Sequence, residues 1–148
     1  MLLVHVAAIT GSAVPRADGP GKVWDYHDWR AACHWIDEHT PRDALFLTPR
    51  SSQTFKWYAN RGEVVTWKDI PQNAGQLVEW WRRMAEVHGT GATPPDKPWY
   101  PSLAERGTEQ VNQLAEKYQA AYVLTSAEPP LELERVYENR TYALYKVK

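Results

Sequence analysis

Two continuously apolar runs flank a short aromatic stretch near the middle of the chain. The runs are Ala44–Leu47 and the β-branched and aromatic Val64–Trp67. Such runs are typical of strands that are buried on both faces in a parallel sheet. The segment therefore predicts a β-α-β unit, in which Ser51 or Ser52 caps the helix and Gly62 ends it in a left-handed conformation.

Residues 24–40 show the clearest helical period. Their apolar positions recur at i, i+3, i+4 and i+7, which predicts a buried face made of Trp29, Ala32, Cys33 and Ile36. Asp25 is expected to cap this helix, and Thr40 ends it because a residue before proline avoids helical angles. The single cysteine falls on the inner face, so it is interpreted as a small core residue rather than a reactive thiol.

A second helix is predicted after Asn73, whose side chain can cap it. Its apolar face, widened by Trp80, is expected to comprise Leu77, Val78, Trp81, Met84 and Ala85. A further helical segment follows a capping box that Ser102 and Glu105 can form.

Strand patterns complete the predicted fold. Residues 121–125 form a third apolar run, and residues 133–137 and 141–147 predict a hairpin. Alternating helices and strands indicate an α/β fold, with three layers, a mainly parallel sheet and a C-terminal antiparallel hairpin. One domain is expected over residues 23–148, and a chain of this length can bury a core without disulfides.

Residues 1–22 are predicted to form an apolar leader followed by a linker rich in Gly and Pro. A membrane-spanning helix needs about 20 apolar residues, and the run MLLVHVAAIT has half that number. No basic residue precedes it, which argues against a secretory signal. Three interpretations stay open: the end of a membrane helix that begins upstream, a strand, or a disordered leader.

Composition narrows the classes of partner. Seventeen basic and eighteen acidic residues give a net charge of -1 with no basic cluster, which argues against nucleic acid as a partner. Eight Trp and eight Tyr accompany only two Phe. Such rings bury one edge and offer a polar atom at the other, so packing between helices and sheet is favoured over stacking on sugars.

Candidate ligand-binding residues follow the predicted strands, because open α/β sheets bind ligands beyond the carboxyl ends of their strands. Arg50, with Ser51, Ser52 and the next helix N-terminus, can hold a phosphate or carboxylate, although the loop matches no phosphate-binding motif. Lys68 and Asp69 can position a polar ligand or simply pair with each other. Thr125 ends the third strand, and Arg61 is expected to reach Asp69 or a chain terminus.

The segment 89–101 contains four prolines and no periodic pattern. Long loops of this kind are often lids or binding loops, which makes Trp99 and Tyr100 candidate contact residues. The alternative is a rigid strap that packs on the domain.

Motifs for metal and catalytic chemistry are weak. His34 and Glu38 share a helical face, but no HExxH pattern supplies further metal ligands. The sequence has no GxSxG nucleophile motif either. We therefore predict no metal, no cofactor and no catalytic residue in this chain.

Four segments together resemble a known group of proteins: WRAACHWIDEHTPRDALFLTPR, FKWYANR, VVTWKDIP and VYENRTYALYKVK. They are similar to the soluble C-terminal domain of bacterial polytopic membrane proteins related to glycosyltransferases of the dolichyl-phosphate-mannose mannosyltransferase type. The resemblance implies a non-catalytic accessory domain on the extracytoplasmic face, whose partner is a membrane-embedded domain and which binds or positions an acceptor. In that group the membrane part carries the catalytic acids.

An alternative hypothesis comes from another functional class. The chain would then be a free-standing binder of a saccharide or an anionic small molecule, or an enzyme, with its site at the carboxyl edge of the sheet. Arg50, Lys68, Asp69 and Thr125 would form that site. A purely structural module is the third possibility.

Overall fold

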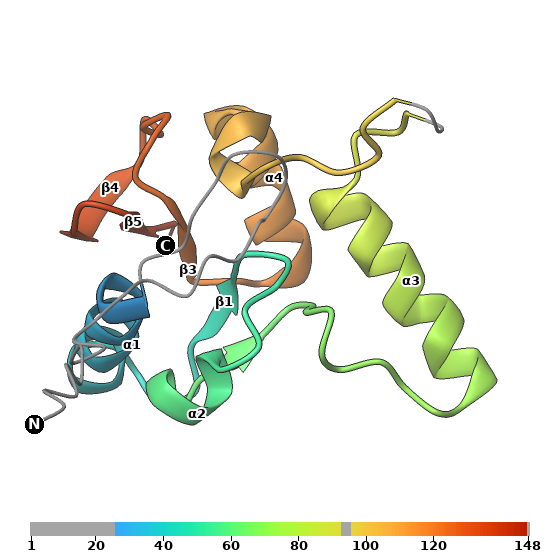
Figure 1. Ribbon diagram of the computed structural model, residues 1–148, viewed down its shortest axis with the longest axis horizontal. Helices are drawn as coiled ribbons and strands as arrows, with labels where there is room; N and C mark the ends of the chain where they lie inside the picture. Colours follow the sequence, from blue (N-terminus) through green and yellow to red (C-terminus); the bar gives the residue numbers. More distant parts are fainter. Residues whose placement is uncertain (1–25, 93–95, 148) are drawn as a thin grey trace, which may run out of the picture.

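Ten elements make up the described part of the chain, residues 26–92 and 96–147 of the computed structural model (Figure 1). The predicted leader, linker and cap Asp25 lie outside these residues. In chain order the elements are α1 (Tyr26–His39), β1 (Leu45–Leu47), α2 (Phe55–Ala59), β2 (Gly62–Glu63), α3 (Ala74–His88), the 3₁₀ helix η1 (Leu103–Arg106), α4 (Thr108–Tyr118), β3 (Tyr122–Ser126), β4 (Glu134–Glu138) and β5 (Tyr142–Lys146).

The five strands form one mixed sheet in the order β2-β1-β3-β5-β4. β1 pairs in parallel with β2 and β3, whereas β5 pairs antiparallel with β3 and β4. The predicted C-terminal hairpin is confirmed as β4 and β5. The fold is therefore mixed α/β, a coarser class than the mainly parallel sheet that the sequence predicts.

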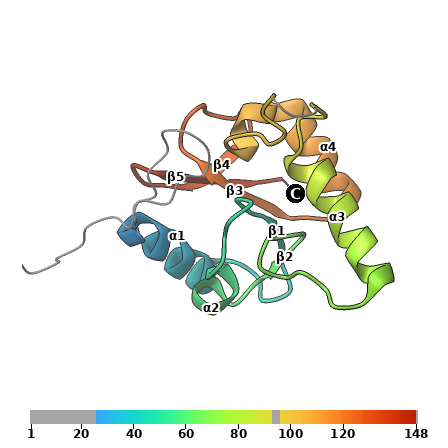
Figure 2. The same cartoon turned by 45° about the vertical axis from the view of Figure 1, so that its right-hand side comes forward.

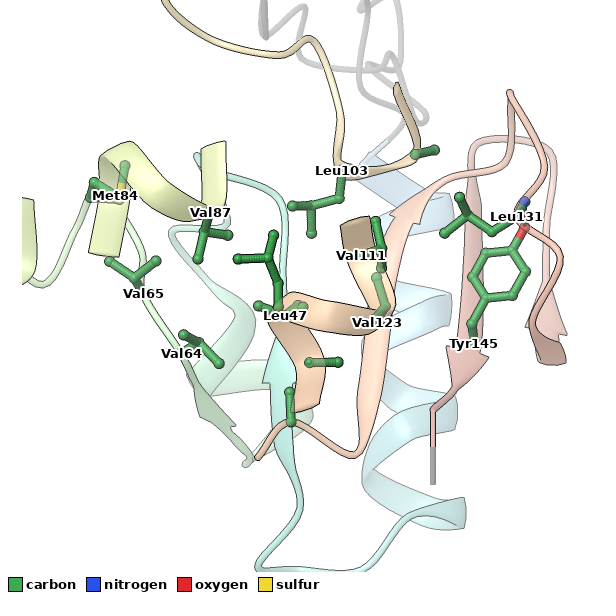
Figure 3. Close-up of a cluster of buried hydrophobic side chains, with 14 of the residues drawn as sticks. Leu47, Val64, Val65, Met84, Val87, Leu103, Val111, Val123, Leu131 and Tyr145 are labelled. Atoms are coloured by element: carbon green, nitrogen blue, oxygen red, sulfur yellow. Dashed lines mark hydrogen bonds between the residues drawn. The ribbon is translucent and has the colours of Figure 1, made fainter. Parts of the chain in front are cut away.

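Side-chain alternation along the strands divides the core into two clusters. On β3, Val123 belongs to the cluster that includes α3 and α4, and its neighbours Tyr122 and Leu124 belong to the cluster that includes α1 and α2. The views agree, with α1 and α2 on one side of the sheet and α3 and α4 on the other (Figure 2). Figure 3 shows the first cluster, where Leu47 lies between strands and helices.

The predicted inner face of α1 is confirmed. Its four apolar residues, Trp29, Ala32, Cys33 and Ile36, are all buried in the second cluster. Burial of an aliphatic or aromatic side chain contributes roughly 1.5–3 kcal/mol, so this face anchors α1 to the sheet. Burial also raises the pKa of the Cys33 thiol, which keeps it protonated as the core interpretation requires.

The β-α-β unit is present, but its second half differs from the prediction. The strand β2 is Gly62–Glu63, and the predicted strand Val64–Trp67 is irregular although Val64 and Val65 are buried. The left-handed residue that ends α2 is Asn60, with φ 51°, rather than Gly62. Gly62 instead lets β2 approach the Leu45 side chain closely, because a Cβ there would lie 3.1 Å from Leu45 Cδ1.

The start of α2 also differs from the prediction. Thr54 is the N-cap residue and makes no side-chain capping bond. The backbone carbonyl of Ser51 accepts a hydrogen bond from Gln53 N at 2.8 Å, and the hydroxyl of Ser52 donates to Glu63. Neither serine caps the helix, because the chain makes turns through residues 50–54 before helical geometry begins.

The Arg61 side chain satisfies backbone carbonyls at the C-terminal ends of α1 and α2. The last carbonyls of a helix have no partner within it, and a cation near that end interacts favourably with the helix dipole. The guanidinium of Arg61, only 4% exposed, donates to the carbonyls of Ile36, Asp37, Thr40, Ala59 and Asn60 and to the hydroxyl of Thr40. It also pairs with the Asp37 carboxylate at 3.3 Å. The expected contact with Asp69 or a terminus is wrong.

The helix α3 has the predicted cap but a different buried face. Asn73 Oδ1 accepts hydrogen bonds from the backbone N–H groups of Gly75 and Gln76. The buried residues are Trp80, Met84, Val87 and His88, whereas Leu77, Val78 and Trp81 are exposed. The indole N–H of Trp80 donates to Thr66 O at 3.0 Å, which fixes this ring inward. The predicted face is therefore wrong by about one residue position around the helix.

Candidate functional site

Loops that follow β1 and β2 are joined beyond the carboxyl ends of these strands. Trp67 N donates to Arg50 O at 3.1 Å. At the end of β3, Thr125 Oγ1 accepts a hydrogen bond from Ala104 N at 3.0 Å and so holds η1 at the same edge. This edge is where the strand-end rule places a ligand.

Two arginines lie on aromatic rings at this edge. The Arg50 guanidinium lies 5.2 Å from the ring centroid of Trp99, and that of Arg106 lies 4.8 Å from the ring centroid of Tyr100. A cation–π contact of this kind holds each guanidinium group against its ring. We name the group Arg50, His88, Trp99, Tyr100, Ser102 and Arg106 the cationic cluster.

Backbone bonds hold the ends of the 89–101 segment together beside α3. Tyr100 N donates to His88 O, and Thr90 N donates to Pro98 O, both at 2.9 Å. Arg106 Nη1 donates to Gly89 O at 2.9 Å, so η1 is tied to the same place. Trp99 and Tyr100 are therefore fixed in position over the end of α3.

Three buried polar atoms of the cationic cluster have no hydrogen-bond partner among the described residues: His88 Nε2, Ser102 Oγ and Arg106 Nε. The predicted capping box is wrong, because the Ser102 hydroxyl makes no capping bond. Arg106 also forms no ion pair within residues 26–92 and 96–147. Each unsatisfied buried group costs about 1–3 kcal/mol, and three such groups in one place call for an explanation.

The charged side chains of the cationic cluster, Arg50 and Arg106, are both positive. Burial and then the charges of Arg50 and Arg106 lower the pKa of His88 from 6.5 to about 3. The imidazole is therefore neutral at pH 7. Burial also lowers the pKa of the Arg106 guanidinium, against weaker opposing effects of Tyr100 and Glu86. Such surroundings favour a negative charge and disfavour a further positive one.

A second polar group at the same edge is fully bonded. Glu63 Oε1 accepts hydrogen bonds from the hydroxyls of Ser52 and Thr48, the latter at 2.9 Å. Ser52 Oγ also lies 3.1 Å from Thr48 Oγ1 and 3.5 Å from Thr66 Oγ1. Burial raises the pKa of the Glu63 carboxyl, and these hydroxyl donors and Lys56 oppose the rise. We name Thr48, Ser52, Glu63 and Thr66 the hydroxyl–carboxyl cluster.

A cavity of about 400 Å³ lies between the β2 edge and α3. Glu63, Asp69 and Glu79 line it together with Arg83. Arg83 is already paired with Glu79, with 2.7 Å between Nε and Oε1, and Asp69 is paired with Lys56. Each charged group that lines this cavity therefore has a partner, because Glu63 accepts from the hydroxyls of Thr48 and Ser52.

Residues 27–87 match one family model, described as Domain of unknown function (DUF6798). No curated protein matches the chain. The DUF6798 segment covers less than half of the chain and runs from α1 to α3, so it contains Arg50 and the hydroxyl–carboxyl cluster but ends just before His88.

The predicted site residues fall into two groups. Arg50, Trp99 and Tyr100 meet in the cationic cluster, and Thr125 positions η1 behind it. The others make local contacts elsewhere. Ser51 and Ser52 shape the turn before α2.

Lys68 and Asp69, the other two predicted residues, do not pair with each other. Lys68 Nζ lies 4.0 Å from the ring centroid of Trp57 and donates to Gln53 O at 3.1 Å. Asp69 pairs with Lys56 on α2. Both side chains thus fix the turn after β2 against α2, and neither belongs to the cationic cluster.

Sequence reasoning missed His88, Ser102 and Arg106 as site residues. No spacing links them, because α3 and η1 contribute them separately and tertiary contacts bring them together. The one available signal is their position, since all three lie close to the ends of the segment 89–101, for which the sequence leaves open a binding loop or a rigid strap.

The described residues hold neither a cluster of metal ligands nor a helix that could span a membrane. No group of three or more His, Cys, Asp and Glu side chains within residues 26–92 and 96–147 is arranged to hold a metal ion. Among the helices of these same ranges, none combines the length and the apolar character that crossing a bilayer requires.

Proposed function

We propose that this domain binds a small molecule through an anionic group, a phosphate or a carboxylate, in the cationic cluster. Three buried atoms carry the proposal, because they have no hydrogen-bond partner among residues 26–92 and 96–147: His88 Nε2, Ser102 Oγ and Arg106 Nε. The charges of two guanidinium groups, those of Arg50 and Arg106, act on His88. Each of these atoms can donate a hydrogen bond, and an anion accepts several at once.

The chemistry favours an anion over other ligands. A guanidinium offers a rigid fork of N–H donors that suits phosphate and carboxylate. Arg50 and Arg106 each lie against an aromatic ring, Trp99 and Tyr100 respectively. Neutral His88 adds a donor without the cost of a third buried charge. The strands β1, β2 and β3 form the parallel part of the sheet. Ligands of such sheets bind beyond the carboxyl ends of the strands, which supports a site at this edge.

The wider role is an extension of this proposal. An anionic saccharide acceptor fits the resemblance to accessory domains of glycosyltransferase-like membrane proteins, and the domain would hold that acceptor without performing chemistry itself. Fractionation of source cells followed by immunoblotting tests this part. A large band in the membrane fraction supports it, and a band near 17.0 kDa in the soluble fraction rejects it.

Binding is tested by thermal unfolding and calorimetry with inorganic phosphate, sulfate, sugar phosphates and uronic acids. A ligand present at 100 times its Kd should stabilise the fold by about 2.7 kcal/mol. Arg106→Gln should abolish the response. Arg82→Gln is the matched control, because Arg82 is an exposed arginine of α3 that pairs with Glu79 and Glu86.

Two results would reject the proposal. One is the absence of stabilisation by any of these anions in the unmodified chain. The other is an anion response that Arg106→Gln and Arg82→Gln reduce equally, because that pattern indicates general charge screening rather than a site.

A further inference from the structure

The helix α3 carries apolar residues on two sides, and only one side is fully covered. Trp80, Met84 and Val87 face the core. On the second side Val78 is 71% exposed and Trp81 is 50% exposed, and part of the Trp81 ring lies against Trp67 and Trp99. Figures 1 and 2 both show α3 along the margin of the molecule, with its outer side turned away from the sheet. Exposed apolar side chains grouped on one helix are typical of an interaction surface.

The outer side has the spacing of a helix-pairing seam. Ala74, Val78, Trp81 and Ala85 are all exposed and follow one another at intervals of four, three and four residues. This is the a/d spacing with which one helix packs along another. The seam runs the length of α3, which spans Ala74–His88. The surface therefore fits a second helix rather than a small ligand.

The order of residues along the seam suits a second copy of α3. In either direction along the helix, a small alanine comes first, two large residues follow, and a small alanine comes last. A second copy of α3 in antiparallel orientation places Ala74 opposite Ala85 and Val78 opposite Trp81. A twofold interface requires this kind of self-complementary surface.

Charges beside the seam are compatible with a second copy. Arg82 pairs within its own helix with Glu79 at 2.8 Å and with Glu86 at 3.0 Å. The antiparallel register brings Arg82 of one copy beside Gly75 of the other, so no like charges meet. The two acids and two arginines of α3 also cancel. A membrane surface is less well matched, because attraction to anionic lipids needs excess positive charge.

We propose that two copies of this domain associate through antiparallel packing of α3, with Val78 and Trp81 at the centre of the interface. The DUF6798 segment includes this part of α3. None of the four seam residues belongs to the cationic cluster, so either proposal can fail without the other.

Sedimentation velocity and light scattering over a range of concentrations of the full chain test the association. We expect a dimer whose Kd rises about 100-fold or more in Val78→Glu, because that change buries a charge without a partner. Trp57→Glu is the matched control: Trp57 is equally exposed, at 71%, but lies on α2. Circular dichroism confirms folding, and Val78→Lys repeats the test with the opposite charge.

Cysteine cross-linking tests the orientation. Two single variants, Ala74→Cys and Ala85→Cys, are mixed and oxidised. The antiparallel arrangement predicts disulfides between the two variants, and a parallel arrangement would give disulfides within each variant. Cys33 is buried and is common to both proteins. Lys56→Cys on α2 serves as the exposed control.

Several results would overturn the proposal. These are a monomer at every concentration, a dimer that Val78→Glu leaves intact, or disulfides formed within each variant only. A monomer that binds lipid vesicles through Trp81 would also overturn it, since a membrane would then be the partner of this surface.

Discussion

Arg61 and Arg106 are both partly or fully buried arginines, yet their surroundings are opposite. Every guanidinium nitrogen of Arg61 donates a hydrogen bond, and its charge is matched by Asp37 and by the C-terminal ends of α1 and α2. Arg106 has one bond to Gly89 O, an unpartnered Nε and no ion pair among the described residues. The hydrogen-bond donors of Arg61 are thus all used within the fold, whereas Arg106 Nε is not.

The contrast extends to the neighbouring groups. Around Glu63 each buried hydroxyl has a hydrogen-bond partner, whereas in the cationic cluster His88 Nε2 and Ser102 Oγ have none among the described residues. A satisfied buried polar group holds the fold together, and an unsatisfied one lowers its stability. The unsatisfied groups mark the place where we propose that an anionic ligand binds.

Removing Arg61 should have the largest effect on stability. Arg61→Met leaves the carbonyl groups at two helix ends without their donor and removes one of the two arginines that pair with Asp37. Loss of one partner from a buried charged network costs about 3–5 kcal/mol. Denaturant unfolding of the two proteins measures the difference in the free energy of unfolding.

Arg42→Met is the matched control for Arg61→Met. Arg42 pairs with the same carboxylate, with 3.6 Å between Nη1 and Asp37 Oδ1, but its side chain is 79% exposed. Its removal should cost about 0–1 kcal/mol. Equal losses in the two variants would show that the ion pair, and not the capping of helix ends, is what stabilises this region.

Periodicity in the sequence predicts the mixed α/β class and part of the fold. The face of α1 and the C-terminal hairpin came directly from repeated apolar positions. The face of α3 did not, because the helix has apolar residues on two sides and only a tertiary bond, from Trp80 to Thr66 O, decides which side turns inward. Helical period alone gives no preference between them.

The candidate site was predictable only in part, for a similar reason. Arg50 follows a predicted strand and Trp99 and Tyr100 lie in a predicted loop, so local rules could select them. His88 is a candidate because its buried Nε2 has no hydrogen-bond partner among the described residues. Its pKa depends on burial and on Arg50 and Arg106, which lie in other parts of the chain. Spacing along the chain carries no information on such contacts.

Stability below pH 6.5 should depend on His88. The pKa of His88 is about 3 in the folded protein, against an ordinary value of 6.5. As the pH falls below 6.5 the unfolded chain takes up a proton that the folded protein does not, so the unfolding free energy falls. Between pH 6.5 and 4.5 the loss should reach about 2–3 kcal/mol.

His88→Phe should remove that part of the pH dependence and leave the stability at pH 7 unchanged or higher, because the unpartnered Nε2 is lost. His34→Phe is the control, since the His34 side chain is 73% exposed. A bound anion should also weaken the pH dependence, because its charge opposes those of Arg50 and Arg106. Identical pH profiles for the unmodified chain and His88→Phe would contradict the account of this residue.

The smallest difference, and the most direct test of the comparison, comes from two serines. Ser52→Ala removes a buried donor from Glu63 and should cost about 1–3 kcal/mol, whereas Ser102→Ala removes a hydroxyl with no partner and should change stability by about 0–1 kcal/mol in the favourable direction. Both are measured by denaturant unfolding without ligand. With an anion bound, Ser102→Ala should become the less stable protein, because the hydroxyl then has an acceptor. If Ser102→Ala destabilises the ligand-free protein as much as Ser52→Ala does, Ser102 has a structural role and the two clusters do not differ in kind.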